Sequence, residues 1–435
     1  MKCHICKTES EFEAAFIKEW RSFRTIQSTV CPACWVRRRN RFEGTYQLAI
    51  LAGAAAGYGL LWLDPRSTPG TLLTALFLIN LFLILSIIPH ELGHAVAARL
   101  AGWRVFQIVI GIGKSIYRRN FFGILFDFHR VPVNGTTVSA PMNTRWFRIK
   151  RTFILLAGPA VNAVSASAVF FVYQDAWRNE GLFSLPPAPR YFFLANLCVL
   201  AVNLWPRHLK TLGLPSDGRQ LLNILTVSKQ AQDELVAMRY VLEANMCREH
   251  QRSAEAARAW CDQGLAMFPE NLHLMIMSGV LLLDQHEYER ARDLYLKLLD
   301  RNGAENMRHI LLNNIAYIDA LIGRPELLSE ANDYSKQAYD AQPWAASIIG
   351  TRGTVLVAMN LLDEGIALLI KAYDAAESPR SKAENACHLS VAHARKGNSG
   401  DARKYLDLAG QLDSQCTLIR VAEGKLHGSA STSDP

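Results

Sequence analysis

The chain has 435 residues, enough for two or three domains, and 50% of them are hydrophobic. Its formal net charge is +8, and the first 150 residues hold 19 Lys and Arg against 8 Asp and Glu. Basic residues beside long apolar runs are typical of segments next to a lipid bilayer, so we expect no nucleic-acid partner. Nine cysteines, most of them scattered, exclude a disulfide framework and indicate a reducing compartment.

Residues 1–41 predict a small zinc-ribbon-like module. They hold two Cys-x-x-Cys pairs, formed by Cys3, Cys6, Cys31 and Cys34. Zinc prefers four soft ligands in a tetrahedron, and a segment this short needs a metal to supply its folding energy. We therefore expect one structural zinc ion here. The first 40 residues have no apolar core, so we expect no signal peptide.

Four apolar runs predict membrane-spanning helices at about residues 46–63, 72–98, 153–173 and 191–206. Arginines at positions 37, 38, 39 and 41 precede the first run, which places its N-terminal end in the cytoplasm. Four spans return the chain to that side, so both terminal regions are expected there. Residues 45–228 then form the membrane domain of a multi-pass protein, which we place in the cell membrane.

Between the second and third spans, residues 104–150 are basic and contain β-type runs such as Val105 to Ile110. The segment from Val131 to Val138 includes Asn134-Gly135 and predicts a turn between strands. We expect a cytoplasmic β-rich insertion. Its edge can accept an extended peptide as an added strand.

The second apolar run ends in His90-Glu91-Leu-Gly-His94. Two histidines four positions apart project from one face of a helix and can bind one zinc ion, with Glu91 beside it as a general base. Ionisable groups at membrane depth are costly and usually functional. This motif therefore predicts a catalytic zinc site, which needs a third protein ligand.

Elimination reduces the number of candidates for the third zinc ligand. Few carboxylates follow the motif before residue 233, namely Asp127, Asp175, Glu180 and Asp217. Two of them fall in the loop expected outside the membrane, and one falls in the β-rich insertion. Asp217 follows the fourth span on the cytoplasmic side, where the histidines also lie, so it is favoured. His129 and His208 remain alternatives because imidazole also binds zinc.

From residue 230 to 420 the pattern is helical and repetitive. Small residues recur in steps of 37, at Gly279, Ala316, Gly353 and Ser390. Twelve positions after these residues lie Ala291, Leu328, Gly365 and Ala402. The pattern resembles tetratricopeptide repeats, an α-solenoid of helix pairs that presents a surface to protein partners. Residues 427–435 are expected to form a disordered tail.

Three motifs in order resemble the site-2 protease family of intramembrane zinc metalloproteases. They are His90 to His94, Gly158-Pro-Ala-Val-Asn162, and Asp217-Gly218. The resemblance implies cleavage of a transmembrane protein substrate, with Asp217 as third zinc ligand and Asn162 and Asn203 as polar groups near the substrate. One difference is the ten residues between Pro206 and Asp217, where the family commonly has only a few.

The sequence thus predicts a mainly α fold: about four membrane spans, a small β-rich insertion and an α-solenoid. The expected function is zinc-dependent hydrolysis of peptide bonds in transmembrane proteins, near the cytoplasmic side of the bilayer. A catalytically inactive membrane scaffold is the alternative, although the intact Glu91 argues against it. A zinc protease with a glutamate as third ligand is disfavoured because no Glu occurs from 92 to 179.

Overall fold

A computed structural model describes residues 17–21, 26–30, 32–182, 185–206, 208–209, 214–251 and 253–430. The chain divides into two compact units, Arg39–Leu242 and the combination of Met1–Arg38 with Glu243–Pro435. The two units divide between Leu242 and Glu243, within helix α7 (Lys229–Met246), and the domain limits expected from the sequence stay a prediction. The side chains of the four paired cysteines lie outside the described part, so the zinc-ribbon module stays a prediction.

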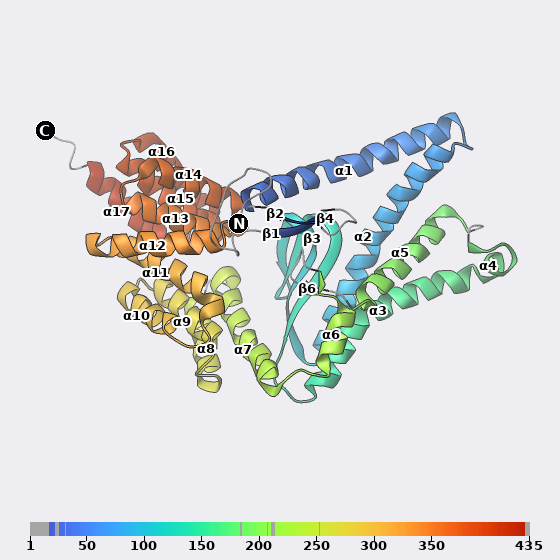
Figure 1. Ribbon diagram of the computed structural model, residues 1–435, viewed down its shortest axis with the longest axis horizontal. Coiled ribbons are helices and arrows are strands. Elements are labelled where there is room, and N and C mark those ends of the chain that lie inside the picture. Colours follow the sequence, from blue (N-terminus) through green and yellow to red (C-terminus); the bar gives the residue numbers. More distant parts are fainter. Residues whose placement is uncertain are drawn as a thin grey trace. The chain divides into compact units, whose positions relative to one another are not determined.

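A helix covers each of the four predicted spans (Figure 1): α1 (Pro32–Leu63), α2 (Thr68–Leu100), α3 (Phe147–Val172) and α5 (Pro187–Leu204). A short helix, α4 (Gln174–Glu180), lies between α3 and α5. Two of the four, α2 and α3, are long and apolar enough to cross a bilayer, whereas the apolar part of α1, Leu48–Leu63, is shorter. The described residues therefore contain two candidate spans, and the topology of four spans remains a prediction.

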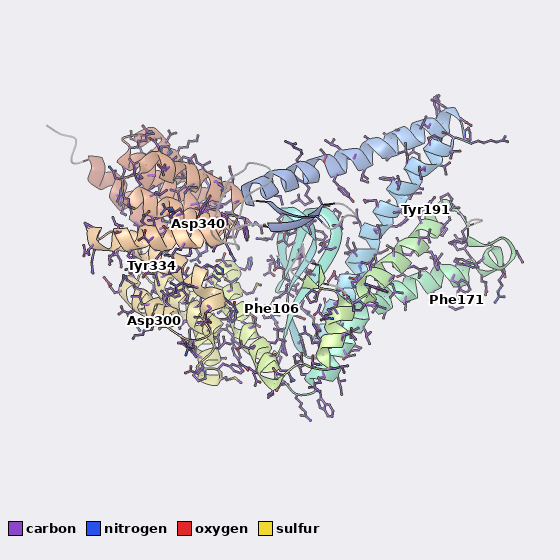
Figure 2. The ribbon with its side chains drawn as sticks, viewed as in Figure 1. Phe106, Phe171, Tyr191, Asp300, Tyr334 and Asp340 are labelled. Atoms are coloured by element: carbon purple, nitrogen blue, oxygen red, sulfur yellow. The ribbon has the colours of Figure 1, made fainter. Side chains whose placement is uncertain are left out.

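Much of the apolar surface of these helices faces outward. Phe171, labelled in Figure 2, is 65% exposed on α3, and Val164 and Val172 of the same helix are exposed as well. In α2, Leu72 and Leu76 are likewise exposed. Contiguous exposed apolar surface of this kind is typical of a contact with lipid or with another protein.

The predicted β-rich insertion is an antiparallel pair of long, bent strands, β3 (Trp103–Phe121) and β4 (Ile124–Pro141). The first half of β3 pairs with the last half of β4, while the second half of β3 pairs with the beginning of β4. Gly111 and Gly113 lie between the two halves of β3 with φ of 93° and 97°. Their left-handed backbone is readily adopted only by glycine, and it lets the strand bend sharply.

The prediction of a turn at Val131 to Val138 is wrong, because this segment belongs to β4. The chain reverses at Phe122-Gly123, where both residues have positive φ, as a tight hairpin turn requires. Asn134-Gly135 is a strong turn signal in sequence. In the structure, Asn134-Gly135 lies inside β4, near a shift in its pairing with β3, and Gly135 packs against Glu91 of α2.

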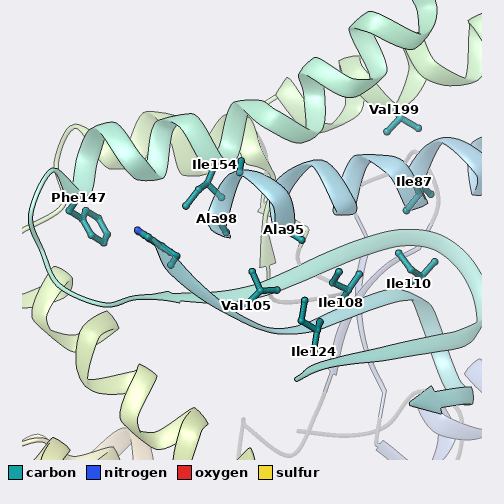
Figure 3. Packing of buried hydrophobic residues seen from close by; sticks show 12 residues of the cluster. Ile87, Ala95, Ala98, Val105, Ile108, Ile110, Ile124, Phe147, Ile154 and Val199 are labelled. Atoms are coloured by element: carbon teal, nitrogen blue, oxygen red, sulfur yellow. The ribbon is translucent and has the colours of Figure 1, made fainter. Parts of the chain in front are cut away.

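Helix α2 is held between α3 and the strands by one hydrophobic core (Figure 3). Ala95 and Ala98 of α2 share a buried cluster with Val105 and Ile108 of β3, and Ile154 of α3 belongs to the same cluster. The alanines keep α2 close to its neighbours because they have small side chains. The core therefore holds the C-terminal part of α2, which carries the His-Glu-x-x-His motif, between α3 and the strand pair.

A buried carboxylate, Asp127, pairs with residues in the half of the strand pair next to the turn at Phe122-Gly123, which we call the far half. Asp127 of β4 is 1% exposed and accepts hydrogen bonds from Arg118 Nε at 2.9 Å and Ser115 Oγ at 2.6 Å. His129 Nε2 lies 3.4 Å from the same carboxylate. Burial alone would raise the pKa of Asp127, but the hydrogen bonds from His129, Arg118 and Ser115 hold that pKa well below its usual range.

The second unit contains two short antiparallel strands, β1 (Ile17–Arg21) and β2 (Ile26–Val30), and a series of helix pairs. After a π-helical turn, η3 (Cys247–Gln251), the helices are α8 (Ala254–Met267), α9 (Leu272–Asp284), α10 (Tyr288–Leu299), α11 (Arg308–Ile322), α12 (Pro325–Ala341), α13 (Ala346–Ala358), α14 (Leu362–Ala375), α15 (Pro379–Arg395), α16 (Ser399–Leu412) and α17 (Leu418–Ala430). A 3-10 turn, η4 (Glu305–Met307), precedes α11. The last helix continues to Ala430, which is within the segment expected to be a disordered tail.

The recurring small residues lie where paired helices touch. A Cβ on Gly353 of α13 would come within 3.0 Å of the backbone oxygen of Gly365 in α14. In the next pair, Ser390 of α15 donates a hydrogen bond to the backbone oxygen of Ala402 in α16 at 2.7 Å. The step of 37 residues therefore corresponds to one helix pair, as predicted.

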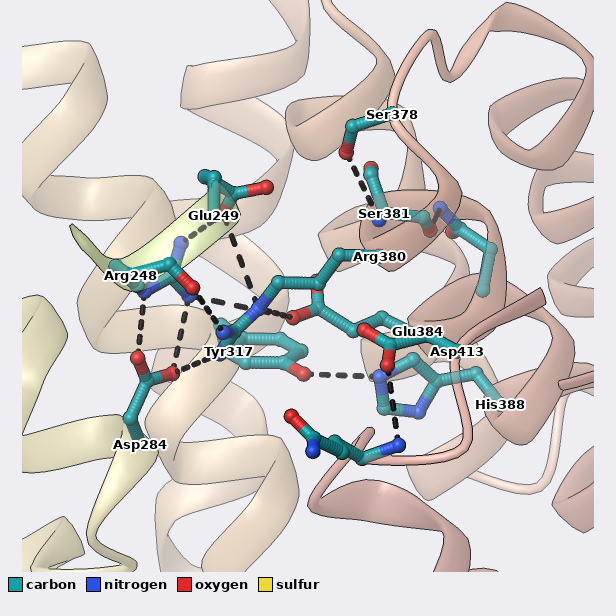
Figure 4. Close-up of polar contacts among 12 residues, drawn as sticks. Arg248, Glu249, Asp284, Tyr317, Ser378, Arg380, Ser381, Glu384, His388 and Asp413 are labelled. Atoms are coloured by element: carbon teal, nitrogen blue, oxygen red, sulfur yellow. Dashed lines mark hydrogen bonds and ion pairs between the residues drawn. The ribbon is translucent and has the colours of Figure 1, made fainter. Parts of the chain in front are cut away.

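A cluster of charges joins early and late repeats (Figure 4). Arg248 of η3 donates to Asp284 at 2.5 and 3.0 Å, and Arg380 of α15 donates to the same carboxylate at 2.7 Å. Arg380 also donates to the backbone oxygen of Arg248, 132 positions earlier, at 3.3 Å. Glu249 and Glu384 complete the cluster. These ion pairs connect η3 and α9 to α15, and each of the two arginines has carboxylate partners.

Candidate metal centre

The three ionisable residues of the motif are buried in the C-terminal part of α2. His90, Glu91 and His94 are 2%, 5% and 6% exposed, although they end the most apolar run of the chain. Helical spacing puts both imidazole rings on one face, with ring centroids 4.7 Å apart. Buried ionisable groups need partners, and the surrounding helices and strand supply them.

Asp217 completes a group of three donor atoms. The Nε2 atoms of His90 and His94 are 3.1 Å apart, and each lies 3.3 Å from Asp217 Oδ2. Among the described residues, these three form the group able to hold a metal ion. Two ligands about 2.05 Å from a zinc ion at a tetrahedral angle are separated by about 3.3 Å. The donor set and its spacing therefore fit a zinc ion with one position left open.

Both histidines are oriented by hydrogen bonds from the ring nitrogen that faces away from the donor group. His90 Nδ1 donates to Asn162 Oδ1 at 2.5 Å, and His94 Nδ1 donates to the backbone oxygen of Ile154 at 2.7 Å. A proton on Nδ1 leaves the lone pair of Nε2 free to bind a metal. Helix α3 thus supplies the second partner of each ring.

The His90 contact is part of a longer chain of hydrogen bonds. Asn162 is 0% exposed, and its Nδ2 donates to Asn196 Oδ1 of α5 at 2.9 Å and to the backbone oxygen of Ser86 at 3.2 Å. Asn196 Nδ2 in turn donates to the backbone oxygen of Phe192 at 2.9 Å. With its partners fixed in this way, the Asn162 amide presents its oxygen, not its nitrogen, to His90.

Gly158 of α3 allows the two helices to meet at the histidines. A Cβ at this position would lie 2.8 Å from His90 Nε2 and 2.7 Å from His94 Cε1. Any larger residue would displace one of the rings. Gly158 and Asn162 are one helical turn apart, so the same face of α3 provides both the space and the hydrogen-bond acceptor.

A small strand pair brings Asp217 back to the end of α5. Strands β5 (His208–Leu209) and β6 (Leu214–Pro215) are antiparallel, and they close the long excursion that precedes α6 (Asp217–Ile224). Ser216 caps α6 and donates a hydrogen bond to the backbone oxygen of Trp205 at 2.7 Å. Gly218 packs directly on the backbone of Leu204, where a Cβ would clash. Because of these two contacts, Asp217 lies close to the C-terminal end of α5 although ten residues separate it from Pro206.

Glu91 points toward the strand pair. Its carboxylate contacts two residues of β4, Gly135 and Thr137, and the Thr137 hydroxyl lies 2.7 Å from Oε2. The base, the two imidazoles and Asp217 thus come from α2 and α6, while α3, α5 and β4 hold them in place.

The structure brings together the predicted base Glu91 and the three predicted zinc ligands His90, His94 and Asp217. Asn162 lies beside them as a partner of His90. Asn203 donates to the backbone oxygen of Val199 in its own helix at 3.1 Å, and its role near a substrate stays a prediction. His129 contacts Asp127 and the backbone of Gly113, apart from the donor group, and the side chain of His208 lies outside the described part.

Sequence reasoning missed Asn196 and Thr137. A buried asparagine in an apolar helix is a signal that could have identified Asn196, because an amide in such a position needs partners. Thr137 carries no such signal, since threonine is common in strands.

A comparison with known proteins agrees with this geometry. The model of Peptidase family M50 matches residues 77–386, more than half of the chain. The chain belongs to peptidase family M50. This is the family of site-2 proteases, so the resemblance noted in the sequence is confirmed, and the protein is a metallopeptidase by family.

Two curated relatives are similar to part of the membrane metallopeptidase. The regulator of sigma E protease of Haemophilus influenzae is 31% identical over 110 residues, which are 22% of this chain and 24% of the relative. A Campylobacter jejuni protein whose name gives it as a zinc metalloprotease is 32% identical over 112 residues, 22% of this chain and 29% of the relative. The chain thus matches only about a quarter of the length of these relatives.

Solved structures of repeat proteins are similar to part of this metallopeptidase. A thermophilic TPR protein of Thermus thermophilus is 16% identical, with a TM-score of 0.35, over 44% of this chain and 99% of that one. MamA of Desulfovibrio magneticus is 19% identical, with a TM-score of 0.28, over 41% of this chain and 96% of that one. The repeat architecture rests on the helix pairs themselves.

Proposed function

We propose that this metallopeptidase is an intramembrane endopeptidase that hydrolyses peptide bonds of transmembrane proteins near the cytoplasmic side of the bilayer. The observation that carries the proposal is the triangle of donor atoms from His90, His94 and Asp217, beside a buried Glu91. His90, Glu91 and His94 lie near the C-terminal end of α2, whose preceding turns are apolar and largely exposed, and Asp217 reaches them from α6. This arrangement suits hydrolysis at the boundary of a membrane.

His90, His94 and Asp217 would hold a zinc ion, which would supply Lewis acidity toward the scissile carbonyl group and toward water. Glu91 accepts the proton of the attacking water molecule and later gives a proton to the leaving amine, as a general acid–base catalyst does. Asn162 and the backbone oxygen of Ile154 accept hydrogen bonds from Nδ1 of the two imidazoles, so each ring turns its Nε2 toward the donor group. Asp217 contributes the negative charge of the donor set.

The strand pair is the proposed place for the substrate. A peptide bond in a helix is shielded from attack, so the substrate has to unwind and bind in an extended form, and β3 or β4 offers an edge for it. In the proposed topology, four spans keep both terminal regions in the cytoplasm of a cell-membrane protein, and the donor group lies near the cytoplasmic boundary. The two apolar helices α2 and α3 support this topology in part.

The terminal regions are proposed to select or regulate substrates. The helix pairs from α8 to α16 provide a surface for protein partners. The four cysteines near the N-terminus, Cys3, Cys6, Cys31 and Cys34, are proposed to hold a second, structural zinc ion, which the doubled Cys-x-x-Cys spacing supports.

The test compares wild-type protein with Glu91→Gln in cells. New N-termini of membrane proteins are identified by mass spectrometry of membrane fractions. Cleaved fragments should disappear and full-length substrates should accumulate in Glu91→Gln, while zinc content is retained because the ligands are intact. Asp217→Asn should lose both the fragments and one zinc ion per chain.

Identical fragment patterns in wild type and Glu91→Gln would contradict the proposal. In that case the alternative, a catalytically inactive scaffold that acts through its repeats and its N-terminal module, would be favoured. Zinc is best counted with the four N-terminal cysteines replaced by serine, so that the only measured metal is the one held in the membrane unit.

A further inference from the structure

One strand of the β pair is in direct contact with the general base. Side chains alternate between the two faces of a strand, so residues 135 and 137 of β4 lie on the same face, and residue 136 lies on the other. That face is turned toward Glu91, since both Gly135 and Thr137 contact its side chain. Thr136 instead donates a hydrogen bond to the backbone oxygen of its own neighbour, Gly135, at 2.8 Å.

Thr137 makes the hydrogen bond that orients the carboxylate. Its Oγ1 lies 2.7 Å from Glu91 Oε2 and 3.0 Å from the Glu91 backbone oxygen. Among the described residues, this hydroxyl is the hydrogen-bond partner of the Glu91 side chain. A glutamate has three rotatable side-chain bonds, and contact with both ends of the residue limits that freedom.

Gly135 supplies the space into which the carboxylate fits. A Cβ at this position would lie 2.5 Å from Glu91 Oε1 and even closer to Cγ. The φ of Gly135 is not positive, so the backbone itself does not require glycine here. The close approach of Glu91 does require it, because a side chain at residue 135 would push the carboxylate away.

We infer that Gly135 and Thr137 of β4 are positioning residues for the general base. Thr137 holds Oε2 by its hydroxyl, and Gly135 leaves room for Oε1, so the strand sets the direction of the carboxylate relative to the donor group. The inference rests on the proposed function of Glu91 as base. It gives the strand pair a second task beside substrate binding, because the segment of β4 that pairs with the first half of β3 also holds the base.

Positioning matters because proton transfer requires the base to lie within hydrogen-bond reach of the water. Partners that orient groups around a metal site typically contribute 10- to 100-fold to activity or metal affinity. Because Thr137 contacts the base and none of the metal ligands, its loss should affect turnover without releasing zinc.

Three substitutions separate this role from a structural one. Thr137→Val keeps the shape of the side chain and removes the hydroxyl, Thr137→Ser keeps the hydroxyl, and Thr136→Val makes the same chemical change on the other face of the strand. The assay uses the purified full-length protein and a fluorogenic peptide copied from a cleavage site that the wild type produces. Zinc content and the affinity for acetohydroxamate, a probe that binds zinc and transfers a proton to the neighbouring base, are measured in parallel.

We expect Thr137→Val to lower kcat about 10- to 100-fold, with KM changed less than about twofold and zinc content unchanged. Acetohydroxamate should bind more weakly by a similar factor. Thr137→Ser should restore kcat to within about threefold of the wild type, and Thr136→Val should lower kcat much less than Thr137→Val does. Gly135→Ala should resemble Thr137→Val, because it displaces the same carboxylate.

Two results would overturn the inference. One is a Thr137→Val enzyme with wild-type kcat and acetohydroxamate affinity. The other is an equal loss in Thr137→Val, Thr137→Ser and Thr136→Val, which would mean that the strand, not the hydroxyl, is sensitive. Failure of the proposed function gives a different result, since the wild type and Glu91→Gln would then cleave alike.

Discussion

At the scale of single residues, Asn162 has a clearer task in the structure than in the sequence. The resemblance to site-2 proteases implies a role near the substrate, whereas the buried amide accepts the hydrogen bond of His90 and is itself held by Asn196. The donor role of Nδ2 toward Ser86 and Asn196 leaves the amide no free hydrogen for a substrate oxygen. Orientation of a zinc ligand is therefore the interaction that the described contacts support.

Asn162→Ala should weaken zinc binding by the membrane unit about 10- to 100-fold, because His90 loses the partner that fixes its tautomer and ring direction. Competition with a chelator of known affinity measures the change. Asn203→Ala is the matched control, since Asn203 bonds only within its own helix among the described contacts, and it should keep wild-type zinc affinity. Equal affinities in wild type and Asn162→Ala would exclude the orienting role.

At the scale of elements, the strand pair shows why local signals in the sequence can mislead. Asn-Gly predicts a turn when flanked by strands, and Phe122-Gly123 carries a weaker signal. The reversal nevertheless occurs at Phe122-Gly123. Gly135 meets a different requirement, which is the close approach of the Glu91 side chain. A glycine required by a distant residue looks the same in sequence as a glycine required by a turn.

The far half of the strand pair should be sensitive to acid through Asp127. Its pKa in the folded protein is lowered below the unfolded value of about 4, so its stabilisation is fully present above that value and is lost as the pH falls toward the folded pKa. Asp127→Asn should therefore destabilise the protein at pH 7 by roughly 3 kcal/mol, since it leaves Arg118 without its buried partner. Below pH 4 the difference from wild type should shrink.

Thermal unfolding in detergent at pH 7 and at several values below pH 4 measures this effect. Asp233→Asn is the control, because Asp233 forms only an exposed ion pair with Lys229. A difference between wild type and Asp127→Asn that stays constant with pH would show that the Asp127 carboxylate is not the source of the stability.

At the scale of the whole molecule, the donor group for zinc lies entirely within the unit Arg39–Leu242. Metal that binds only the folded state stabilises the elements that carry its ligands. Among the described residues, the helix pairs of the second unit contain no group that could hold a metal. The stabilisation by zinc should therefore be local to α2, α3 and α6.

Hydrogen exchange with and without EDTA tests that expectation. Removal of the metal should increase exchange in α6 and in the C-terminal part of α2, where the ligands lie, and to a smaller extent in α3. Helices α9 to α16 should keep their protection. A uniform loss of protection along the chain would mean that the two units unfold together.

The sequence by itself determined the features that depend on local periodicity and spacing. These include the positions of the apolar helices, the two histidines one helical turn apart, and the step of 37 residues between helix pairs. Each follows from residues close together in the chain, because a helix imposes a fixed geometry over a few turns.

The tertiary structure alone decided which distant residues meet. His90 and Asn162 are 72 positions apart, and no local pattern shows that Asn162 orients a ligand or that Thr137 holds the base. Elimination by membrane side favoured Asp217, but only the capping of α6 and the strands β5 and β6 explain how it returns to the histidines. Long-range contacts depend on how whole elements pack, and packing follows from complementary shapes that a linear pattern does not contain.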